Sequence, residues 1–200
     1  EHIEEATILL EASTSGSWPS GLDPATNAIS GLNFTLMNAI FGGLFQLTAD
    51  DDGSNSRIIG VLASGYEVSD EGKSLIIRLR KGLKFSDGTP LDAEAVRFNI
   101  ERALKTPCAC APLRFPWAED QPVTVRDETT IALNFNRPYP RAVFSMPLMN
   151  INWIASPTAL RDMGPDAFKI KPVGAGPFKI VSNQPSSELV LEKNSEYWQP

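Results

Sequence analysis

The sequence predicts an α/β fold in which antiparallel hairpins alternate with amphipathic helices. Three observations support this class: short runs of alternating apolar residues, turn dipeptides between those runs, and helical periodicity in two longer segments. The composition is that of an ordinary globular protein, since 42% of the 200 residues are hydrophobic and 21% are charged. A chain of this length can bury one good core or two small ones.

The first predicted elements are a strand and a helix separated by a loop. Residues 7–11 form a short apolar run of strand type, and residues 13–24 are rich in Gly and Pro. A helix is predicted from about Leu32 to Leu44 because apolar residues recur every four positions. The Gly42-Gly43 pair is expected to end it, since glycine lowers helix propensity.

An acidic turn, Asp50-Asp51-Asp52-Gly53, follows a predicted strand at 44–48. A calcium loop of the helix-loop-helix type would need alternating oxygen ligands and a Glu at its twelfth position. Residues 54–60 supply neither feature. We therefore interpret the turn as the solvated tip of a hairpin.

Two hairpins are predicted in the middle of the chain. One pairs Tyr66–Val68 with Leu75–Leu79, and the other pairs Val123–Val125 with Ile131–Phe135. Residues 74–80 alternate in polarity, which predicts a half-buried strand. Its expected core face carries Leu75, Ile77 and Leu79, and its expected solvent face carries Ser74, Arg78 and Arg80, with Ile76 as the apolar exception.

The best defined predicted helix begins after Asp92. The Asp92 carboxylate can accept hydrogen bonds from the first turn, and Glu94 is favoured near the positive end of the helix. One face is apolar, formed by Ala93, Val96, Ile100, Ala103 and Leu104. Residues 106–122 then lack periodicity, and their aromatic side chains, Phe115 and Trp117, are expected to cover a core.

The last third is predicted to contain two short helices, a strand and a hairpin. The helices lie near Arg141–Met146 and after Ser156-Pro157, where Gly164 ends the second one. The strand is predicted at Asn150–Ile154, and the hairpin pairs Phe178–Val181 with Leu189–Lys193. Because Gly174-Ala175-Gly176 leads into a strand and not a helix, a nucleotide-binding loop is excluded there; a crossing between lobes is favoured.

Composition excludes several classes of function. The net charge of −6 and a pI near 4.9 argue against a nucleic-acid-binding surface. His2 is the single histidine, so Ser-His-Asp and Cys-His catalytic designs are not available. Three carboxylates, Asp87, Asp92 and Glu94, could formally support glycoside hydrolysis, but turn and cap roles already explain them. We predict no catalytic residue and no enzyme activity.

Cys108 and Cys110 are separated by one residue, which is too close for an unstrained disulfide. A thiolate metal site would need further ligands, and the paired CxxC spacing of zinc sites is absent, so no metal site is predicted. No apolar run approaches the roughly 18 residues of a membrane span. The acidic residues 1–5 differ from the basic start of a signal peptide, so the sequence is interpreted as cytosolic or already processed.

The segment from Leu79 to Leu104 carries a longer signature, LRKGLKFSDGTP followed by the helix capped by Asp92. It resembles the family 5 solute-binding proteins of ABC transporters, which include oligopeptide, dipeptide and nickel binding proteins. The resemblance covers nearly the whole chain. Its other motifs are Gly21-Leu22-Asp23-Pro24, Val173 to Phe178, Leu189 to Asn194 and Glu196-Tyr197-Trp198, with Ala175 and Phe178 standing where relatives usually carry Thr and Tyr.

The resemblance implies a periplasmic-binding-protein-like type II fold (cluster C). It implies that this chain holds the first lobe with an inserted β-rich subdomain and that the second lobe is missing. The expected division is 1–44 for the first part of lobe I, 45–166 for the inserted subdomain and 167–200 for the return hairpin. Thr7–Leu10 and Phe178–Val181 are then expected to share one sheet, while Tyr66–Phe135 forms a separate β-rich layer.

The resemblance also implies a function. The expectation is an extracytoplasmic protein, periplasmic or lipid-anchored, that captures a small solute, a peptide first of all, and delivers it to a membrane ABC permease. A monomer is expected, with an export signal before Glu1 and with no cofactor or nucleic-acid partner. The alternative is a protein-interaction or sensing module built on the same fold.

Candidate ligand contacts follow from the resemblance. Relatives often line the cleft with the segment after the Asp-Pro motif, which here is Asn27, Ala28, Ile29 and Ser30. Trp18 in the preceding loop is a second candidate. The segment near Met149 to Trp153 approaches the ligand in some relatives, which adds Asn150, Asn152 and Trp153. An Asn near a helix start can instead be a cap, and a loop Trp can instead fill a core.

Overall fold

The computed structural model describes residues 21–26, 31–50, 53, 55–106, 115–184 and 187–199. The helices are α1 (Gly31–Phe41), α2 (Ala93–Lys105), α3 (Ala142–Ser145), α4 (Pro157–Met163) and α5 (Pro165–Phe168), with 3-10 turns η1 (Asp70–Gly72), η3 (Met146–Leu148) and η4 (Asn150–Asn152). The strands are β1 (Phe45–Ala49), β2 (Ser56–Gly60), β3 (Ala63–Ser69), β4 (Ser74–Leu79), β5 (Val123–Asp127), β6 (Thr130–Asn134), β7 (Phe178–Gln184) and β8 (Glu188–Lys193).

Several predictions concern residues outside the described ranges. These are the strand at 7–11, so that its expected pairing with Phe178–Val181 is not tested, and the residues Cys108 and Cys110. They stay predictions.

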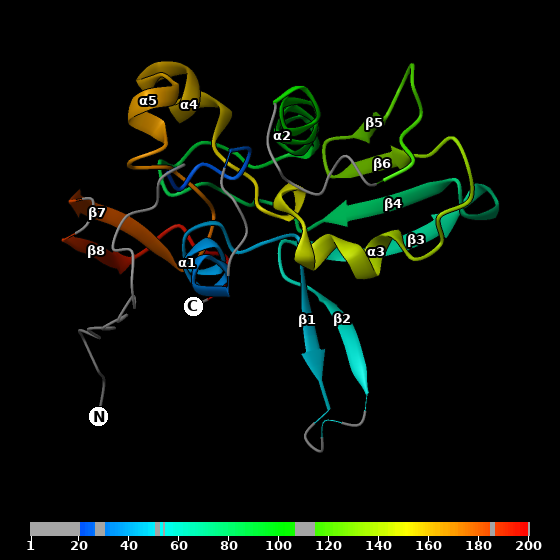
Figure 1. The fold of residues 1–200 in the computed structure, drawn as a ribbon, viewed down its shortest axis with the longest axis horizontal. Coiled ribbons are helices and arrows are strands. Elements are labelled where there is room, and N and C mark those ends of the chain that lie inside the picture. The colour runs from blue at the N-terminus through cyan, green and yellow to red at the C-terminus, as the bar shows by residue number, and fades with distance from the viewer. Residues whose placement is uncertain are drawn as a thin grey trace.

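The two hairpins predicted in the middle of the chain are confirmed, and they join into one sheet. Among the described residues this sheet has four antiparallel strands in the order β3-β4-β6-β5 (Figure 1). The hairpins join through β4 and β6, where Ser74 lies opposite Asn134 and Arg78 opposite Thr130. The sheet is separate from the β7–β8 pair, as expected for a distinct β-rich layer.

Strand β4 differs from the half-buried strand that its alternating sequence predicts. Ser74 and Ile76 are buried along with the core residues, and Arg78 alone of the six residues is exposed. Strand β4 lies between β3 and β6, so side chains of these two strands flank the residues on its second face. There Ile76 lies between Glu67 and Ala132, and an ion pair between Glu67 and Arg78 (2.7 Å) borders it. The hydrocarbon stems of these long side chains can cover an apolar neighbour.

The predicted helix after Asp92 is confirmed as α2. The Asp92 carboxylate accepts a hydrogen bond from the Ala95 N–H at 2.8 Å. The predicted apolar face is the buried one, and it covers the four-stranded sheet as part of the larger core. Phe115 belongs to the same core and Trp117 packs against it; the Phe115 ring is stacked on the Phe135 ring, and the Trp117 ring is tilted by 49° to it.

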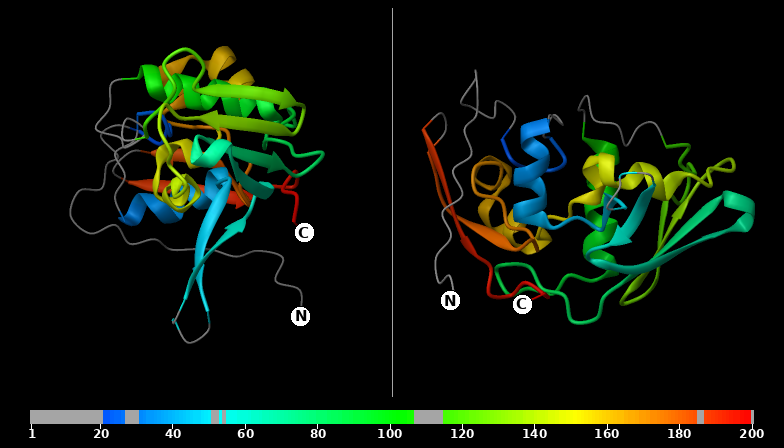
Figure 2. Two further views of the ribbon diagram at one scale, coloured as in Figure 1. Left: turned by 90° about the vertical axis from the view of Figure 1, so that its right-hand side faces the viewer. Right: turned by 90° about the horizontal axis from the view of Figure 1, so that it is seen from below.

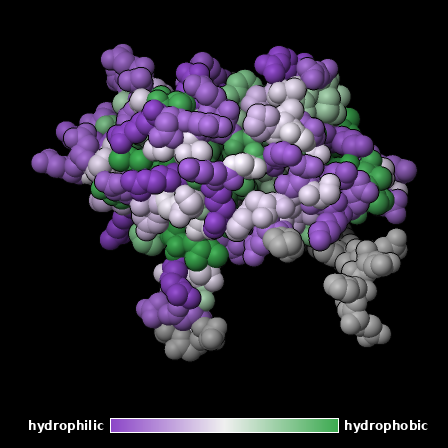
Figure 3. Space-filling view, turned by 180° about the vertical axis from the view of Figure 1, so that it is seen from behind, coloured by the Kyte–Doolittle hydropathy of each residue, from purple (hydrophilic) through white to green (hydrophobic). Residues whose placement is uncertain are grey.

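The strand predicted at 44–48 is confirmed as β1, which forms a hairpin with β2 from Phe45 opposite Gly60 to Ala49 opposite Ser56. This hairpin projects from the body of the molecule (Figures 1 and 2). Leu47 and Ile59 are more than 40% exposed on it. Seen from behind, the surface is mainly polar, and one group of hydrophobic side chains lies just above the projecting hairpin (Figure 3).

A second core lies beside α1, α4, α5 and the β7–β8 hairpin, at the left of Figure 1. The predicted helix at 32–44 is confirmed as α1, which stops at Phe41 just before Gly42-Gly43. The helix after Ser156-Pro157 is confirmed as α4, with the Ser156 hydroxyl accepting from the Ala159 N–H at 3.1 Å and Gly164 at its end. Among the described residues, no helix has the length and hydropathy needed to cross a bilayer.

The strand predicted at Asn150–Ile154 is wrong. Residues 150–152 form the 3-10 turn η4, and the chain continues without a strand partner in the described residues. The alternation of polar and apolar residues has another cause here. Ile151, Trp153 and Ile154 are buried in the cores, and the Asn150 and Asn152 side chains bind backbone groups of distant segments.

Glycines 174 and 176 lie against the C-terminal turn of α1. The Gly176 N–H donates to the Ile40 carbonyl at 2.8 Å. A Cβ atom at Gly176 would come within 2.4 Å of the Ala39 carbonyl oxygen, and one at Gly174 within 2.4 Å of the Ile40 oxygen. The chain can enter β7 this close to α1 because these residues have no side chain.

Candidate ligand-binding region

Five predicted contact residues, Trp18 and Asn27 to Ser30, lie outside the described residues. The structure describes both flanks of the second segment: the turn Leu22–Thr26 precedes it and α1 follows it. The candidate region is therefore built from these flanks and from the side chains that hold them.

A buried ion pair holds the turn. The Asp23 side chain is 3% exposed, and both of its oxygens accept from Arg102 of α2, at 2.5 Å from one terminal nitrogen and 2.8 Å from the other. Asp23 Oδ1 also accepts from the Ala25 N–H at 3.1 Å. The carboxylate therefore fixes both the local turn and its distance from α2. A two-bond Arg–carboxylate contact is among the stronger polar contacts in proteins.

Two further contacts fix the same turn from other directions. The Asn150 side chain donates to the Pro24 carbonyl at 2.6 Å, and the Leu22 N–H donates to the Lys169 carbonyl at 2.7 Å. Gly21 approaches Lys169 so closely that a Cβ atom would lie 2.7 Å from the Lys169 oxygen. The turn thus contacts α2, η4 and the residue after α5.

Asn152, two positions after Asn150, also binds the backbone of a distant segment. Its carboxamide accepts from the Phe45 N–H and donates to the Phe45 carbonyl, both at 2.9 Å. The Leu44 N–H donates to the Asn152 carbonyl at 2.8 Å. These bonds attach the start of β1 to η4.

Trp153 joins η4 to helix α1. Its indole N–H donates to the Asn38 side-chain oxygen at 2.9 Å. Its ring meets the Phe34 ring edge to face, with centroids 5.0 Å apart. Trp153 is 2% exposed and belongs to the core around α1.

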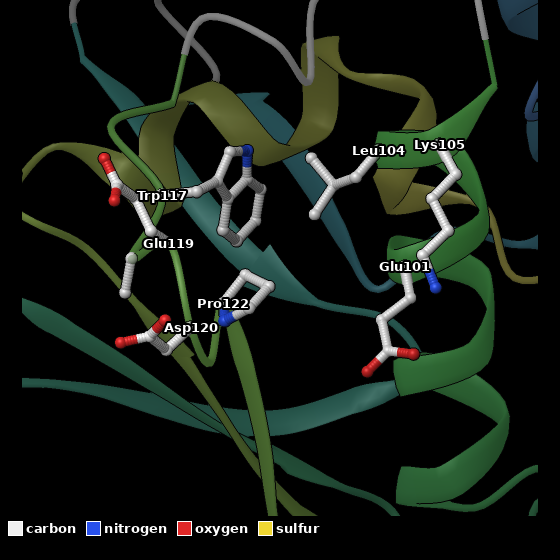
Figure 4. A pocket seen from close by; sticks show the side chains of 8 residues that line it. Glu101, Leu104, Lys105, Trp117, Glu119, Asp120 and Pro122 are labelled. Atoms are coloured by element: carbon white, nitrogen blue, oxygen red, sulfur yellow. The ribbon is translucent and has the colours of Figure 1, made fainter.

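An open groove lies elsewhere, between the last turns of α2 and the loop before β5 (Figure 4). Its volume is about 500 Å³, and Leu104 and Trp117 face one another across it. The charged residues on its walls are Glu101, Lys105, Glu119 and Asp120. The chain between the two walls runs through residues 107–114, which are outside the described ranges. Of the predicted contact residues that the structure describes, Asn150, Asn152 and Trp153, none lines this groove.

Shifted pKa values among the described residues have local causes. Hydrogen bonds from Thr129 and Thr130 hold the pKa of Asp127 below its usual range, and Lys169 does the same for the pKa of Asp166. Burial raises the pKa of the Tyr197 phenol. These shifts arise from a turn, a local ion pair and burial.

Comparison with known proteins gives the family. Residues 57–200 match the family described as "Bacterial extracellular solute-binding proteins, family 5 Middle". This match covers more than half of the sequence. The chain belongs to family 5. The family resemblance stated from the motifs is thereby confirmed.

Curated relatives of this family 5 chain match most of it. A probable D,D-dipeptide-binding periplasmic protein, DdpA of Escherichia coli K12, is 31% identical over 183 residues, covering 90% of this chain and 34% of DdpA. The glutathione-binding protein GsiB of Salmonella paratyphi A is 32% identical over 184 residues, covering 92% of this chain and 34% of GsiB. The family 5 chain thus spans about a third of the length of these relatives.

The fold of this family 5 chain matches solved structures. The binding protein AgaA of A. tumefaciens R10, solved in complex with agropinic acid, superposes with a TM-score of 0.74 at 26% identity, covering 92% of this chain and 35% of AgaA. The predicted type II fold is confirmed by such neighbours, and the chain corresponds to a part of it.

The structure brings Asn150, Asn152 and Trp153 next to the described flanks of the predicted contact segment. Each is 2% exposed or less and lies in the interior of the described chain. Each has a side-chain hydrogen bond to another segment, so they support the turn, the start of β1 and helix α1 respectively.

Sequence reasoning missed two residues of α2 that organise this region. Arg102 binds Asp23, and Asn99 binds the Ala155 backbone through both its Oδ1, at 3.0 Å, and its Nδ2, at 2.8 Å. They lie three positions apart and so share one helix face. The signal available in the sequence was that Asn99 and Arg102 are polar residues next to the apolar stripe of the predicted helix.

Proposed function

We propose that this chain is part of the first lobe of an extracytoplasmic solute-binding protein that delivers a small solute to an ABC importer permease. The observation that carries the proposal is membership of family 5 over residues 57–200. DdpA and GsiB are described as binding a D,D-dipeptide and glutathione, which favours a peptide as the solute. No catalytic activity is part of the proposal.

We place the solute contacts of this lobe in Asn27 to Ser30 and Trp18, on the basis of the family motif. The geometry of the described flanks supports this placement. Arg102 and Asn150 hold the turn Leu22–Thr26 through their hydrogen bonds, and Trp153 holds helix α1 through its hydrogen bond to Asn38.

The same proposal divides the chain into 1–44, 45–166 and 167–200. The outer two parts contribute to the first lobe, and the middle part is an inserted subdomain. The protein acts as a monomer outside the cytoplasmic membrane, either periplasmic or lipid-anchored, and its macromolecular partner is the permease and not a nucleic acid. The net charge of −6 supports the last point.

The test uses the longer protein that includes the second lobe. Titration calorimetry with D-alanyl-D-alanine, glutathione and agropinic acid separates a peptide from an opine as the solute class. We expect saturable binding of a peptide, weakened when Asn27 and Ser30 are both replaced by Ala. Binding of agropinic acid alone would overturn the peptide assignment. Binding of none of these, together with capture of a protein partner, would favour the sensing module instead.

A further inference from the structure

We propose that the groove between α2 and the loop before β5 is a second binding site, which takes an alkyl polyamine. Such a ligand is an apolar chain with an ammonium group at each end. The volume of the groove, about 500 Å³, lies in the range of small-molecule sites. The inference does not depend on the proposed function, because the residues that carry it are described and line the groove themselves.

The middle of the groove is apolar. Leu104 from α2 and Trp117 from the loop face one another across it, and Pro122 also lies on the loop side (Figure 4). Leu104 and Trp117 pack against the larger core but are only partly buried. An alkyl chain placed between these two side chains removes apolar surface of both walls from water, which is favourable.

Carboxylates lie on both walls beside this apolar part. Glu101 belongs to α2, and Glu119 and Asp120 belong to the loop (Figure 4). Within the part of the chain that the structure describes, these three side chains have no ion pair or hydrogen bond. Lys105 is the single cationic side chain among the described lining residues, so negative charge is in excess. Charge complementarity therefore favours a cationic ligand and disfavours an anionic one.

The loop wall is held in place by the end of β6. The Asn134 N–H donates to the Pro122 carbonyl at 2.8 Å, and the Ala118 N–H donates to the Asn134 carbonyl at 2.9 Å. The Asn134 side chain also donates to the Gln121 carbonyl at 2.9 Å. Residues 118–122 are thus fixed by contacts within the described chain. A preformed wall loses less entropy when it binds a ligand.

The other wall is equally fixed, since the apolar face of α2 is buried in the larger core. Glu101, Leu104 and Lys105 lie within about one turn of this helix, so their spacing is that of a helix. A ligand with one ammonium group for each wall must match the width of the groove. Chain length is therefore the property that the site should select.

The experiment is titration calorimetry on the longer protein that includes the second lobe. The ligands are the α,ω-diaminoalkanes from 1,3-diaminopropane to 1,8-diaminooctane, with Mg²⁺ as the matched control because it has the same charge and no alkyl chain. The variants Glu101→Gln and Asp120→Asn each remove one carboxylate, one from each wall. The control variant is Asp162→Asn, which removes an exposed carboxylate on α4, outside the groove.

We expect one chain length to bind at least about tenfold more tightly than both Mg²⁺ and the shortest diamine. Glu101→Gln and Asp120→Asn should each weaken this binding by about three- to tenfold, and Asp162→Asn should leave it unchanged. Equal binding of Mg²⁺ and the diamines would overturn the proposal, because charge alone would then explain it.

Two further results would also overturn the proposal. One is the absence of diamine binding to wild-type protein. The other is wild-type affinity in both groove variants, which would place the diamine elsewhere, for example at the solute site. None of these outcomes changes the titrations with glutathione and D-alanyl-D-alanine, which test the proposed function separately.

Discussion

The carboxamide of Asn152 binds both backbone groups of Phe45, a residue 107 positions earlier in the chain, at 2.9 Å each. Phe45 lies opposite Gly60 of β2, and the Asn152 side chain binds the Phe45 backbone as well. Asn152 is 1% exposed and Phe45 is equally buried, so no bulk water can replace these bonds. The attachment explains why β1 begins where it does, directly after the helix α1 and the Gly42-Gly43 pair.

Replacing Asn152 by Ala should therefore destabilise the chain strongly. It would leave a buried N–H and a buried carbonyl without their partner, and such groups cost about 1–3 kcal/mol each. We expect the free energy of unfolding to fall by about 2–4 kcal/mol in denaturant titrations. The control is Asn136→Ala at an exposed position. Equal stability of the two variants would show that the contact is dispensable.

Gly176 gives a second stability prediction, based on close approach. In Gly176→Ala the new methyl group would meet the Ala39 carbonyl oxygen at 2.4 Å and the Ile40 carbonyl carbon at 2.6 Å, both backbone atoms of α1. Overpacking of this kind costs about 1–3 kcal/mol.

The control for Gly176 is Gly65→Ala in β3, where a Cβ atom meets nothing within 4 Å. We expect Gly65→Ala to be neutral or slightly stabilising, because alanine reduces the conformational entropy of the unfolded chain. Melting temperatures of the two variants provide the comparison. A loss of stability at Gly65 similar to that at Gly176 would indicate that glycine is needed for reasons other than space.

Local sequence signals predicted most of the elements of this fold. Helix α2 has its Asp92 cap and apolar stripe within 13 residues, and each hairpin has its turn between two alternating runs. These features depend on neighbours in sequence, so period and turn chemistry are sufficient. The joining of β4 to β6 depends on residues between 52 positions apart (Arg78 and Thr130) and 60 positions apart (Ser74 and Asn134). The burial of Ile76 depends in addition on its neighbour in β3, Glu67.

The candidate region was harder to predict for the same reason. The partners of Asp23, Asn150 and Asn152 lie between 79 and 126 positions away. Nothing near Asn150 in the sequence distinguishes an asparagine that binds a remote carbonyl from one that lies in a strand. The Asp-Pro motif drew attention to the Asp23 turn, and only the structure shows that Asp23 binds Arg102 and that Asn99 binds Ala155.

The turn between β5 and β6 gives a prediction on pH dependence. Asp127 accepts from the Thr129 N–H at 2.9 Å and from its hydroxyl at 3.2 Å, and these bonds lower the pKa of Asp127 in the folded protein from its ordinary 3.8. A group whose pKa is lowered by folding stabilises the folded state above its unfolded pKa. That contribution is lost as pH falls through the folded pKa.

Wild-type protein should therefore exceed Asp127→Asn in stability at neutral pH, and the difference should shrink toward zero in acid well below pH 3.8. Protonated aspartic acid and asparagine are both neutral, so the two proteins then carry the same charge at this turn. Unfolding by denaturant at a series of pH values checks this. A difference that does not change with pH would mean that the carboxylate charge plays no part in the turn.

The last prediction concerns how much of the solute site these 200 residues hold. The chain spans about a third of the length of its curated relatives, and the proposed contacts, Trp18 and Asn27 to Ser30, supply one wall. Small-molecule sites bury about 70–90% of the ligand surface, which a single wall cannot do. Without a second lobe there is also no closed state for the solute to stabilise.

We therefore expect the 200-residue chain to fold, as judged by circular dichroism, and to bind glutathione or D-alanyl-D-alanine at least about a hundredfold more weakly than the longer protein. Calorimetry on both proteins decides the matter, because equal affinities would place the whole site within these residues and remove the need for closure by a second lobe.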